Sequence, residues 1–423
     1  MATSIPLREP SRPSRVVVVG AGAAGLLAAW RAACLGHSVL LLEANPRPGV
    51  KLRISGGGKC NITHEGPVGA VLAVFCKEQA RFLRPAFHAF GNGDLLQLLK
   101  KLGVETYARE NGRVFPLDRP GSAALVVTAL VELTLGAGVE LRTGTRVVAL
   151  EGDKPRVLRL RLEDGAKLEA DQFILATGGA SYPETGTRGE VPGWLHKLGV
   201  SVRPWFPALA PIPLQRAHPE WEGVALRDGS LVLSAGAGGK RLAQHLGDVL
   251  FTKSSLTGPA ALELSRETEA ARRAGAAWLT YAFSQDTAEQ LEATLLEAQR
   301  ENPHLSVRNW VQRWLPERIA EASLNQLQIP PDQRLKDLPR AFRKGLVALV
   351  CAFPLGEPGS VNLARGEVAA GGVALAAVDP RTMAIKGWDN LRVCGELLDV
   401  DGPVGGYNLQ AAFSTGFVAG SLE

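Results

Sequence analysis

Three glycines near the start of the chain have the spacing of a phosphate-binding turn. The stretch GAGAAG places Gly20, Gly22 and Gly25 between a run of valines and an apolar segment of helical periodicity. In this pattern the first glycine permits a tight turn, the second lets a pyrophosphate approach the backbone, and the third lets helix and strand pack closely. Glu43 ends the next apolar run, where its carboxylate can accept both hydroxyls of a ribose. These residues predict a dinucleotide site, with a plain glycine turn as the alternative.

Two distant stretches bear on which dinucleotide is bound. Glu43 favours an unphosphorylated ribose, hence NAD or the adenosine half of FAD. FILATGG (173–179) predicts a buried strand that ends in a ledge of small residues, and residues 393–416 predict a strand, an acidic loop and a helix opening at Gly405-Gly406. The acids of this loop are Glu396, Asp399 and Asp401. An acid can bind ribityl hydroxyls, and a helix N-terminus can stabilise negative charge on a reduced flavin. FAD is therefore favoured, although an ordinary acidic turn before a helix has the same pattern.

ISGGGKCN, residues 54–61, sets three successive glycines beside a lysine and a cysteine. Three glycines are costly to order, so the chain needs them for a flexible linker, a tight turn or a surface that a flat ligand covers. The run follows the strand that ends at Glu43, where an extended FAD would pass, and this favours the ligand surface. Lys51 and Lys59 would then lie near the phosphates or the substrate.

The elements that must position these residues form an α/β pattern. RVVVVG (15–20), the helix after it and SVLLLEA (38–44) make a βαβ unit of buried strands. Proline-rich texture begins near residue 195, and small apolar residues return near 346. We expect a disordered lead-in over 1–14, a discontinuous FAD domain over 15–194 and 346–423, and an inserted domain of strands and helices over 195–345.

Composition limits the class of protein. A chain of 423 residues with 46% hydrophobic and 21% charged residues is typical of a globular protein of two domains. The five cysteines are scattered and never in CxxC spacing, which favours a reduced, cytoplasmic protein without a disulfide framework or metal site. No apolar run has the length of a membrane span, and the N-terminus lacks the apolar region of a signal peptide.

The motifs GAGAAG, LLEAN, KLRISGGGKCNIT, GRVFP, FILATGG, FTKSSLTGPAALELS and GELLDVDGPVGGYNLQAAFSTGFVAG occur in this order from Arg15 to Gly420. In this the chain resembles the BaiN/RdsA-like family of bacterial flavoproteins, also labelled NAD(P)/FAD-dependent or aminoacetone-oxidase-like enzymes. The resemblance implies a glutathione-reductase-like Rossmann domain that binds FAD tightly and carries an inserted domain. Together with the patterns above, it predicts cofactor contacts from Gly20, Gly22, Ala24, Gly25, Glu43, Ala44, Lys51, Ser55, Gly57, Gly58, Cys60, Asn61, Val148, Thr177, Gly178, Gly179, Gly395, Glu396, Asp401, Gly405, Gly406, Asn408 and Leu409.

Catalytic side chains are harder to predict, because in a flavoenzyme the cofactor carries the electrons. Cys60 is a candidate proton donor or charge-transfer partner, and Tyr407 a candidate proton donor; a packing role is the alternative for both, and His64 fits a surface residue. A second strand–GxGxxG–helix unit is lacking, since AGAGGKR (235–241) lacks the third glycine and fits a hairpin turn. NAD(P)H would therefore dock transiently.

Several functions fit this pattern. The first is a reductase or dehydrogenase of a small molecule, reduced by NAD(P)H. The family resemblance adds an enzyme that reduces uridine to dihydrouridine in ribosomal RNA, and an amine oxidase; a non-catalytic FAD scaffold also remains. SVRNWVQRWLPERI (306–319) mixes arginines with Trp310 and Trp314, as nucleic-acid binders do. Two tryptophans four apart are also typical core anchors, and residues 195–345 hold 19 Lys+Arg against 16 Asp+Glu, which is no basic stripe.

Overall fold

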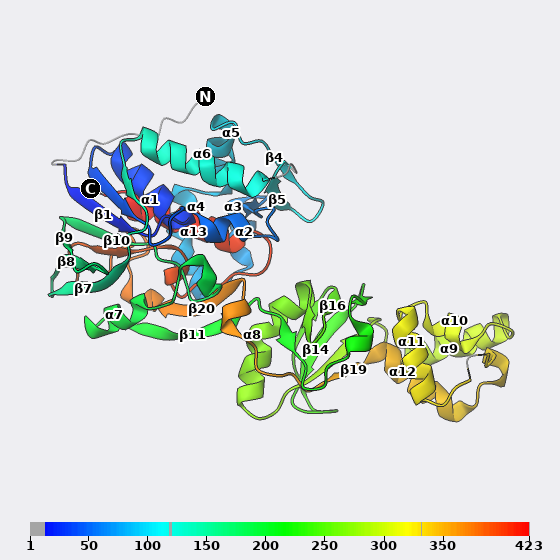
Figure 1. The fold of residues 1–423 in the computed structure, drawn as a ribbon. Helices are drawn as coiled ribbons and strands as arrows, with labels where there is room; N and C mark the ends of the chain where they lie inside the picture. Colours follow the sequence, from blue (N-terminus) through cyan, green and yellow to red (C-terminus); the bar gives the residue numbers. More distant parts are fainter. Residues whose placement is uncertain (1–12, 118–120, 331, 423) are drawn as a thin grey trace. The chain divides into compact units, whose positions relative to one another are not determined.

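The structure, a computed structural model, describes residues 13–117, 121–330 and 332–422 and divides them into two compact units (Figure 1). Unit 1 combines the chain up to Phe206 with the chain from Glu367 onward, and unit 2 is the continuous segment Pro207–Gly366. Most of the predicted lead-in, residues 1–12, lies outside the described residues.

The boundaries of unit 2 fall later than the predicted 195 and 345. Helix α7 (Val191–Lys197) and most of strand β11 (Val202–Ala208) belong to unit 1, where β11 pairs with β20 (Val368–Val373). Helix α12 (Arg340–Cys351) belongs to unit 2 and packs on its strands. Strand pairing and packing define the units, whereas the change in composition along the chain begins and ends earlier.

A parallel five-stranded sheet forms the centre of unit 1. Its order is β21 (Leu391–Val393), β10 (Gln172–Leu175), β1 (Arg15–Val19), β2 (Ser38–Leu42) and β6 (Glu140–Arg142). Four successive valines of β1 are buried because helices cover the sheet, as a fully enclosed parallel strand requires. Helix α1 (Ala23–Cys34) packs against α6 (Ser122–Gly136) and against the C-terminal α13 (Tyr407–Gly420). Both ends of the chain therefore contribute to one layered α/β core, as predicted.

Smaller elements surround this core. Helix α2 (Val50–Ile54) leads into the glycine-rich segment. Helices α3 (Val68–Ala73), α4 (Lys77–Ala89) and α5 (Asn92–Lys101) follow it. One sheet consists of β3 (Thr63–His64), β5 (Arg113–Pro116) and β4 (Thr106–Ala108), another of β7 (Val147–Asp153), β8 (Arg156–Leu162) and β9 (Lys167–Glu169). A hairpin with its turn at Asn111-Gly112 joins β4 to β5, with Gly112 in the left-handed region.

Unit 2 contains two four-stranded antiparallel sheets and a helical part. One sheet orders β12 (Ile212–Pro213), β17 (Ser255–Thr257), β16 (Val249–Phe251) and β13 (Ala225–Leu226); the other orders β15 (Arg241–Leu246), β14 (Ser230–Ser234), β18 (Trp278–Ala282) and β19 (Phe353–Gly356). The helices are α8 (Pro259–Arg273), α9 (Ala288–Glu301), α10 (Val307–Val311), α11 (Glu317–Gln326) and α12. AGAGGKR turns the β14–β15 hairpin, as predicted. In the described chain, no helix combines the length and apolar character needed to span a membrane.

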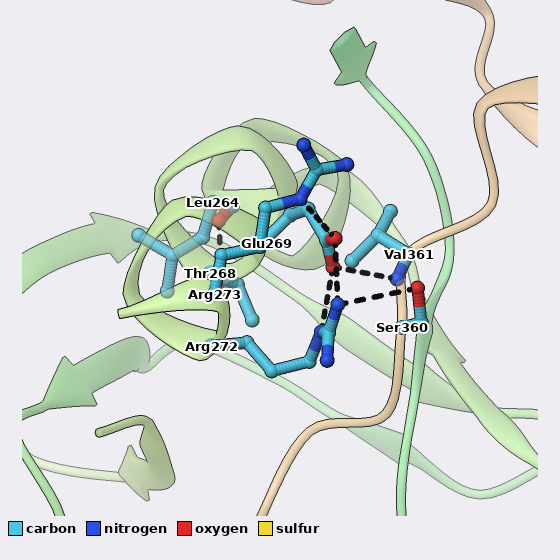
Figure 2. Close-up of polar contacts among 7 residues, drawn as sticks. All are labelled: Leu264, Thr268, Glu269, Arg272, Arg273, Ser360 and Val361. Carbon is cyan, nitrogen blue, oxygen red and sulfur yellow. Dashed lines mark hydrogen bonds and ion pairs between the residues drawn. The ribbon is translucent and has the colours of Figure 1, made fainter. Parts of the chain in front are cut away.

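One buried carboxylate ties α8 to the segment that leaves unit 2. Glu269 has no exposed surface. Its oxygens accept hydrogen bonds from Arg272 Nε (2.9 Å), Arg273 Nε (2.8 Å) and the Val361 N–H (3.0 Å), as Figure 2 shows. The hydrogen bonds from Arg272 are the largest of the effects that lower the pKa of Glu269 to about 2. Burial opposes them, and the bonds from Arg273 and Val361 lower the pKa further. The carboxylate is therefore ionised and satisfied although it is buried.

Candidate functional site

The glycine turn between β1 and α1 has a separate reason for each glycine. Gly20 has φ +102°, and a Cβ there would lie 2.5 Å from the Ala176 carbonyl oxygen. A Cβ on Gly25 would lie 1.7 Å from the Gly20 carbonyl oxygen, so helix and strand meet only because both side chains are missing. A Cβ on Gly22 would meet no described atom within 4 Å. Packing and backbone strain therefore explain Gly20 and Gly25. Gly22 instead leaves open space at the start of the 12-residue helix α1.

Glu43 lies beside this turn with its carboxylate fixed by backbone groups. Its Oε2 accepts a hydrogen bond from the Ala21 N–H at 2.9 Å, and its Oε1 accepts one from the Asn45 N–H at 2.8 Å. Ala44 follows it, and Val148 lies on β7, both partly buried. Each oxygen of Glu43 keeps further lone pairs for donors such as ribose hydroxyls. Two backbone donors therefore hold the Glu43 carboxylate in place.

A second polar centre joins parts of unit 1 that are far apart in the sequence. Lys51 Nζ donates to Ser181 Oγ and to Glu396 Oε2, both at 2.6 Å. Glu396 Oε1 also accepts from the Ser181 hydroxyl (3.2 Å) and the Ala369 N–H (3.0 Å). A Cβ on Gly179 would lie 2.8 Å from the same oxygen, which explains the small residue there. Lys51 and Glu396, predicted as separate cofactor contacts, are therefore partners of each other.

Beside this centre, the small residues that follow β10 include a polar atom without a hydrogen-bond partner in the described chain. Thr177 Oγ1 is buried and has no hydrogen-bond partner in the described chain. Gly178 follows it with φ +77°, a conformation that favours glycine. Buried polar groups in native proteins nearly always have a partner, so this hydroxyl indicates a place where a ligand would complete the contact.

The segment ISGGGKCN forms a tight turn. Gly56, Gly57 and Gly58 have φ values of 58°, 68° and 84°, and a Cβ on Gly57 or Gly58 would meet no described atom within 4 Å. At Gly57 and Gly58 the left-handed backbone alone therefore favours glycine, whereas at Gly56 a Cβ would also lie 2.9 Å from the Asn61 backbone nitrogen. Hydrogen bonds from Gly58 N–H to the Ile54 carbonyl and from Cys60 N–H to the Ser55 carbonyl close the turn. The segment is therefore a closed turn and not a flexible linker.

Cys60 lies at the end of this turn and is fully buried, with φ 56°. Burial raises the pKa of its thiol to about 12, against the opposing effect of a hydrogen bond with Ser55. A thiol with this pKa stays protonated at neutral pH and is a poor nucleophile. The geometry favours the packing role over the catalytic one.

We therefore expect Cys60→Ala to change the rate of flavin reduction by less than about threefold, because a buried neutral thiol contributes packing and not charge. Stopped-flow absorbance near 450 nm, recorded under anaerobic conditions, measures this rate. A loss of a hundredfold or more in a variant that still binds its cofactor would assign Cys60 to the chemistry.

Tyr407, the other predicted catalytic residue, lies in an aromatic cluster. Its ring stacks on His64 with 4.7 Å between centroids and meets Phe75 edge-on at 6.3 Å. Only 9% of Tyr407 is exposed. The ring nitrogens of His64 contact the carbonyl oxygens of Glu65 and Asn111, so His64 holds the β3 region in place. This arrangement, too, favours packing.

The acidic residues of the C-terminal loop bond to other side chains of the protein. Asp401 accepts from Gln79 Nε2 at 2.9 Å, and Asp399 pairs with Arg203 Nη1 at 3.1 Å. Asn408 bonds both the N–H and the carbonyl of Gly402, each at 2.7 Å. A Cβ on Gly406 would lie 2.4 Å from the Thr63 carbonyl oxygen. Four further residues were predicted to contact the cofactor. A Cβ on Gly395 would lie 2.8 Å from the Cβ of Ala24, and Gly405 lies near the Tyr407 ring. The side-chain amide of Asn61 can accept a hydrogen bond from the Gly406 N–H, and Leu409 is partly buried.

Two titratable residues that the sequence analysis missed lie near the Lys51 centre. Tyr182 follows Ser181 and has φ 51°, a strained value for a tyrosine. Burial raises its pKa, and the nearby Glu367 and Glu184 carboxylates raise it further. Desolvation likewise raises the pKa of Glu367, with Arg113 and Lys51 opposing it. The Tyr-Pro pair after TGG hinted at a strained turn, but nothing in the sequence connects it to Glu367.

The chain is similar to a family model and to named proteins along nearly its whole length. A family model described as the HI0933-like protein Rossmann domain matches residues 14–422. A ribosomal RNA dihydrouridine synthase of Escherichia coli (strain K12) is 29% identical over 94% of this chain and 95% of its own. A 3-dehydro-bile acid delta(4,6)-reductase of Clostridium scindens is 28% identical over 96% and 98%.

Among solved structures, a flavocytochrome c3 fumarate reductase matches with a TM-score of 0.50 and 17% identity, over 97% of this chain and 78% of that one. At this identity the match shows a common fold. The predicted α/β Rossmann architecture is confirmed.

Proposed function

The chain belongs to the HI0933-like Rossmann family of FAD-dependent oxidoreductases, and from this premise we propose that it reduces a carbon–carbon double bond conjugated with a carbonyl group. Two relatives carry the proposal, because each matches over at least 94% of this chain. One forms dihydrouridine, the product of adding two hydrogens across the C5=C6 bond of uracil. The other is named for the reduction of double bonds in a 3-keto steroid. Both reactions deliver a hydride to one carbon and a proton to its neighbour.

The described residues fit an FAD molecule along the carboxyl edge of the main sheet. The space at Gly22 and the N-terminus of α1 suit the pyrophosphate, and the Glu43 carboxylate suits the ribose of the adenosine half. The buried Thr177 hydroxyl and the Lys51–Glu396 centre lie farther along the same edge, where the other half of the cofactor would pass. When bound, FAD supplies the hydride, and the residues of the chain position the substrate and supply the proton.

Tyr182 and Glu367 are the groups that we assign to proton transfer. Both hold their protons to higher pH than usual, and both lie near Lys51 at the end of the proposed flavin site. A general acid of this kind contributes about 10²- to 10⁴-fold in rate. We expect Tyr182→Phe or Glu367→Gln to slow substrate reduction by at least about a hundredfold and to leave flavin reduction by the nicotinamide unchanged, because only the second half-reaction consumes this proton.

Stopped-flow measurement of the two half-reactions separates these effects. If Glu367 is the donor, the rate of the second half-reaction falls as pH rises through its raised pKa, and Glu367→Gln abolishes this dependence. Glu163→Gln is the matched control, since Glu163 is an exposed glutamate elsewhere in unit 1. Equal slowing of both half-reactions in Tyr182→Phe and Glu367→Gln would assign the two residues to cofactor positioning and not to proton transfer.

An anaerobic titration tests the reaction class itself. The yellow protein should lose its absorbance near 450 nm with NADH or NADPH and regain it when an α,β-unsaturated ketone or a uridine oligonucleotide is added. Bleaching by an aminoketone, with peroxide formed in air, would instead identify an amine oxidase and contradict the proposal.

Reduction of uridine in ribosomal RNA is the second candidate function. It is favoured by two relatives with this name, from Escherichia coli and Haemophilus influenzae. The segment 306–319 gives it no support, because Trp310 is fully buried, Arg308 pairs with Glu317 and Glu321, and Arg318 donates to backbone carbonyls. Loss of a dihydrouridine from ribosomal RNA after deletion of the gene would favour this substrate, and an unchanged content would exclude it.

A further inference from the structure

The two segments that carry the proposed proton donors are bonded to one carboxylate. Ser181, which directly precedes Tyr182, donates from its hydroxyl to Glu396 Oε1 at 3.2 Å. Ala369, which follows Glu367 by two positions, donates its backbone N–H to the same oxygen at 3.0 Å. Two segments that are far apart in the sequence therefore meet at a single oxygen atom, close along the chain to each donor.

A cation holds that carboxylate at its other oxygen. Lys51 Nζ donates to Glu396 Oε2 and to the Ser181 hydroxyl oxygen, both at 2.6 Å. The Lys51 and Glu396 side chains keep only 29% and 18% of their surface exposed, so the ion pair is partly shielded from water. Such shielding strengthens hydrogen bonds between charged groups. Both oxygens of Glu396 are therefore held by donors of the protein.

The turn around Tyr182 requires an anchor because its backbone is strained. Tyr182 has φ 51° and ψ 62°, a left-handed conformation that persists in a residue with a side chain only where the surrounding structure enforces it. After the turn, the Tyr182 carbonyl oxygen accepts from the Thr185 N–H at 2.8 Å and from the Thr185 hydroxyl at 2.7 Å. Asn45 Nδ2 donates to the Thr185 carbonyl oxygen at 2.8 Å. Before the turn, the bond from Ser181 to Glu396 has the same role.

Strand β20 is attached to the C-terminal acidic loop in a similar way. One of its edges pairs with β11. The Ala369 N–H donates to the Glu396 carboxylate at 3.0 Å. Two positions farther along, the Gly371 N–H donates to Asp399 Oδ1 at 3.1 Å. Alternate N–H groups of a strand point to the same side, so both carboxylates bond to one edge of β20. The start of this strand, next to Glu367, is therefore held by Glu396.

We propose that Glu396 is a positioning residue, which holds Tyr182 and Glu367 in the places from which they deliver a proton to the substrate. Its oxygens accept from Lys51, from the Ser181 hydroxyl and from the Ala369 N–H, and each of these bonds fixes a different segment of unit 1. The assignment goes beyond the cofactor contact that the sequence predicts for Glu396. It rests on the proposed function for the roles of Tyr182 and Glu367.

The charge of Glu396 has a further consequence at Glu367. Burial raises the pKa of Glu367, and the cations Arg113 and Lys51 oppose this effect. Tyr182 is a further titratable group that interacts with the Glu367 carboxylate. Because Glu396 is the anion paired with Lys51, removing its charge leaves that cation uncompensated. We therefore expect Glu396→Gln to lower the pKa of Glu367, and Lys51→Met to raise it.

Stopped-flow measurement of substrate reduction at a series of pH values tests this consequence, with FAD added in excess. The rate falls as pH rises through the pKa of the donor, so the fall should move to lower pH in Glu396→Gln and to higher pH in Lys51→Met. Asp389→Asn is the matched control, because it removes an exposed carboxylate elsewhere in unit 1 and should move the profile in neither direction. Shifts of the same sign in Glu396→Gln and Lys51→Met would contradict the proposal.

The loss of all three bonds is tested with Glu396→Ala. We expect substrate reduction to slow by about tenfold to a hundredfold, as is usual when reacting groups are displaced. Hydrogen–deuterium exchange of the Ala369 amide measures the positioning without any reaction, in flavin-loaded and in flavin-free protein. This amide should exchange about tenfold faster or more in Glu396→Ala, because its acceptor is removed.

The two measurements separate a failure of the positioning from a failure of the proposed function. Unchanged exchange of the Ala369 amide in Glu396→Ala would overturn the proposal, whether or not this variant retains its FAD. Faster exchange with a normal rate of substrate reduction would also overturn it, since the bonds would then stabilise the fold alone. Normal substrate reduction in Tyr182→Phe and Glu367→Gln would instead refute the proposed proton donors, while the exchange of Ala369 still reports its bond to Glu396.

Discussion

Replacing Glu269 with alanine is expected to lower the free energy of unfolding of unit 2 by about 1.5–3 kcal/mol, the usual worth of hydrogen bonds to a charged group, because the carboxylate is buried whereas both arginines are partly exposed. The carboxylate accepts four hydrogen bonds, two from Arg272, one from Arg273 and one from the Val361 N–H (Figure 2). Its loss removes these four bonds, including the one between α8 and the Val361 backbone.

Urea unfolding followed by tryptophan fluorescence measures the loss, since Trp221, Trp278, Trp310 and Trp314 all lie in unit 2. Glu267→Ala is the matched control because Glu267 is an exposed glutamate of the same helix. It should change the free energy of unfolding by less than about 0.5 kcal/mol. A loss below 1 kcal/mol in Glu269→Ala would show that the cluster does not hold the unit together.

The same carboxylate determines an acid dependence. Its pKa in the folded protein is about 2, below the ordinary value of 4.5, so its protonation favours the unfolded chain. The stabilisation is fully present above about pH 4.5 and is lost progressively as pH falls towards 2. The wild type should therefore lose more stability than Glu269→Ala over this interval.

The second large effect is expected at Gly22, where an added methyl group should abolish tight binding of FAD but not folding. A Cβ there meets no described atom within 4 Å, and its φ of −87° suits any residue. The methyl group would occupy the space that a pyrophosphate needs in order to reach the N-terminus of α1. We expect Gly22→Ala to weaken FAD binding on the order of 100-fold, or about 2.7 kcal/mol.

Titration of flavin-free protein with FAD, followed by flavin fluorescence, measures this affinity. Gly93→Ala is the matched control, since an added Cβ in α5 also meets no described atom. It should keep the affinity and be as stable as the wild type or slightly more so. Gly25→Ala, in contrast, should fail to fold unit 1, because its Cβ would lie 1.7 Å from the Gly20 carbonyl oxygen. Normal FAD affinity in Gly22→Ala would refute the proposed position of the cofactor.

Local features of the site could be predicted from the sequence because the residues that create them are neighbours. Gly20, Gly22 and Gly25 act within one turn, and Glu43 ends the adjacent strand, so spacing alone indicated their positions. The turn at Asn111-Gly112 and the hairpin at AGAGGKR were predictable for the same reason.

Pairings between distant segments could not be predicted. Lys51 and Glu396 lie 345 positions apart, and no local pattern shows that they bond. Glu269 reads as an ordinary charge on an amphipathic helix until the Val361 segment covers it. Cys60 and Tyr407 looked reactive by residue type, but burial and ring stacking, which depend on the whole fold, favour packing for both. Tyr182 and Glu367 were missed because their raised pKa values result from three-dimensional crowding.

The place of β21 in the main sheet has a consequence for how the protein is made. This edge strand pairs with β10, and α13 packs against α1, although both come from a part of the chain that is synthesised after all of unit 2. Unit 2 is continuous, so its residues are complete before β21 emerges during synthesis, whereas the α/β core cannot be completed until β21 and α13 have been made. A nascent chain that stops before Leu391 is therefore expected to have an unfinished sheet.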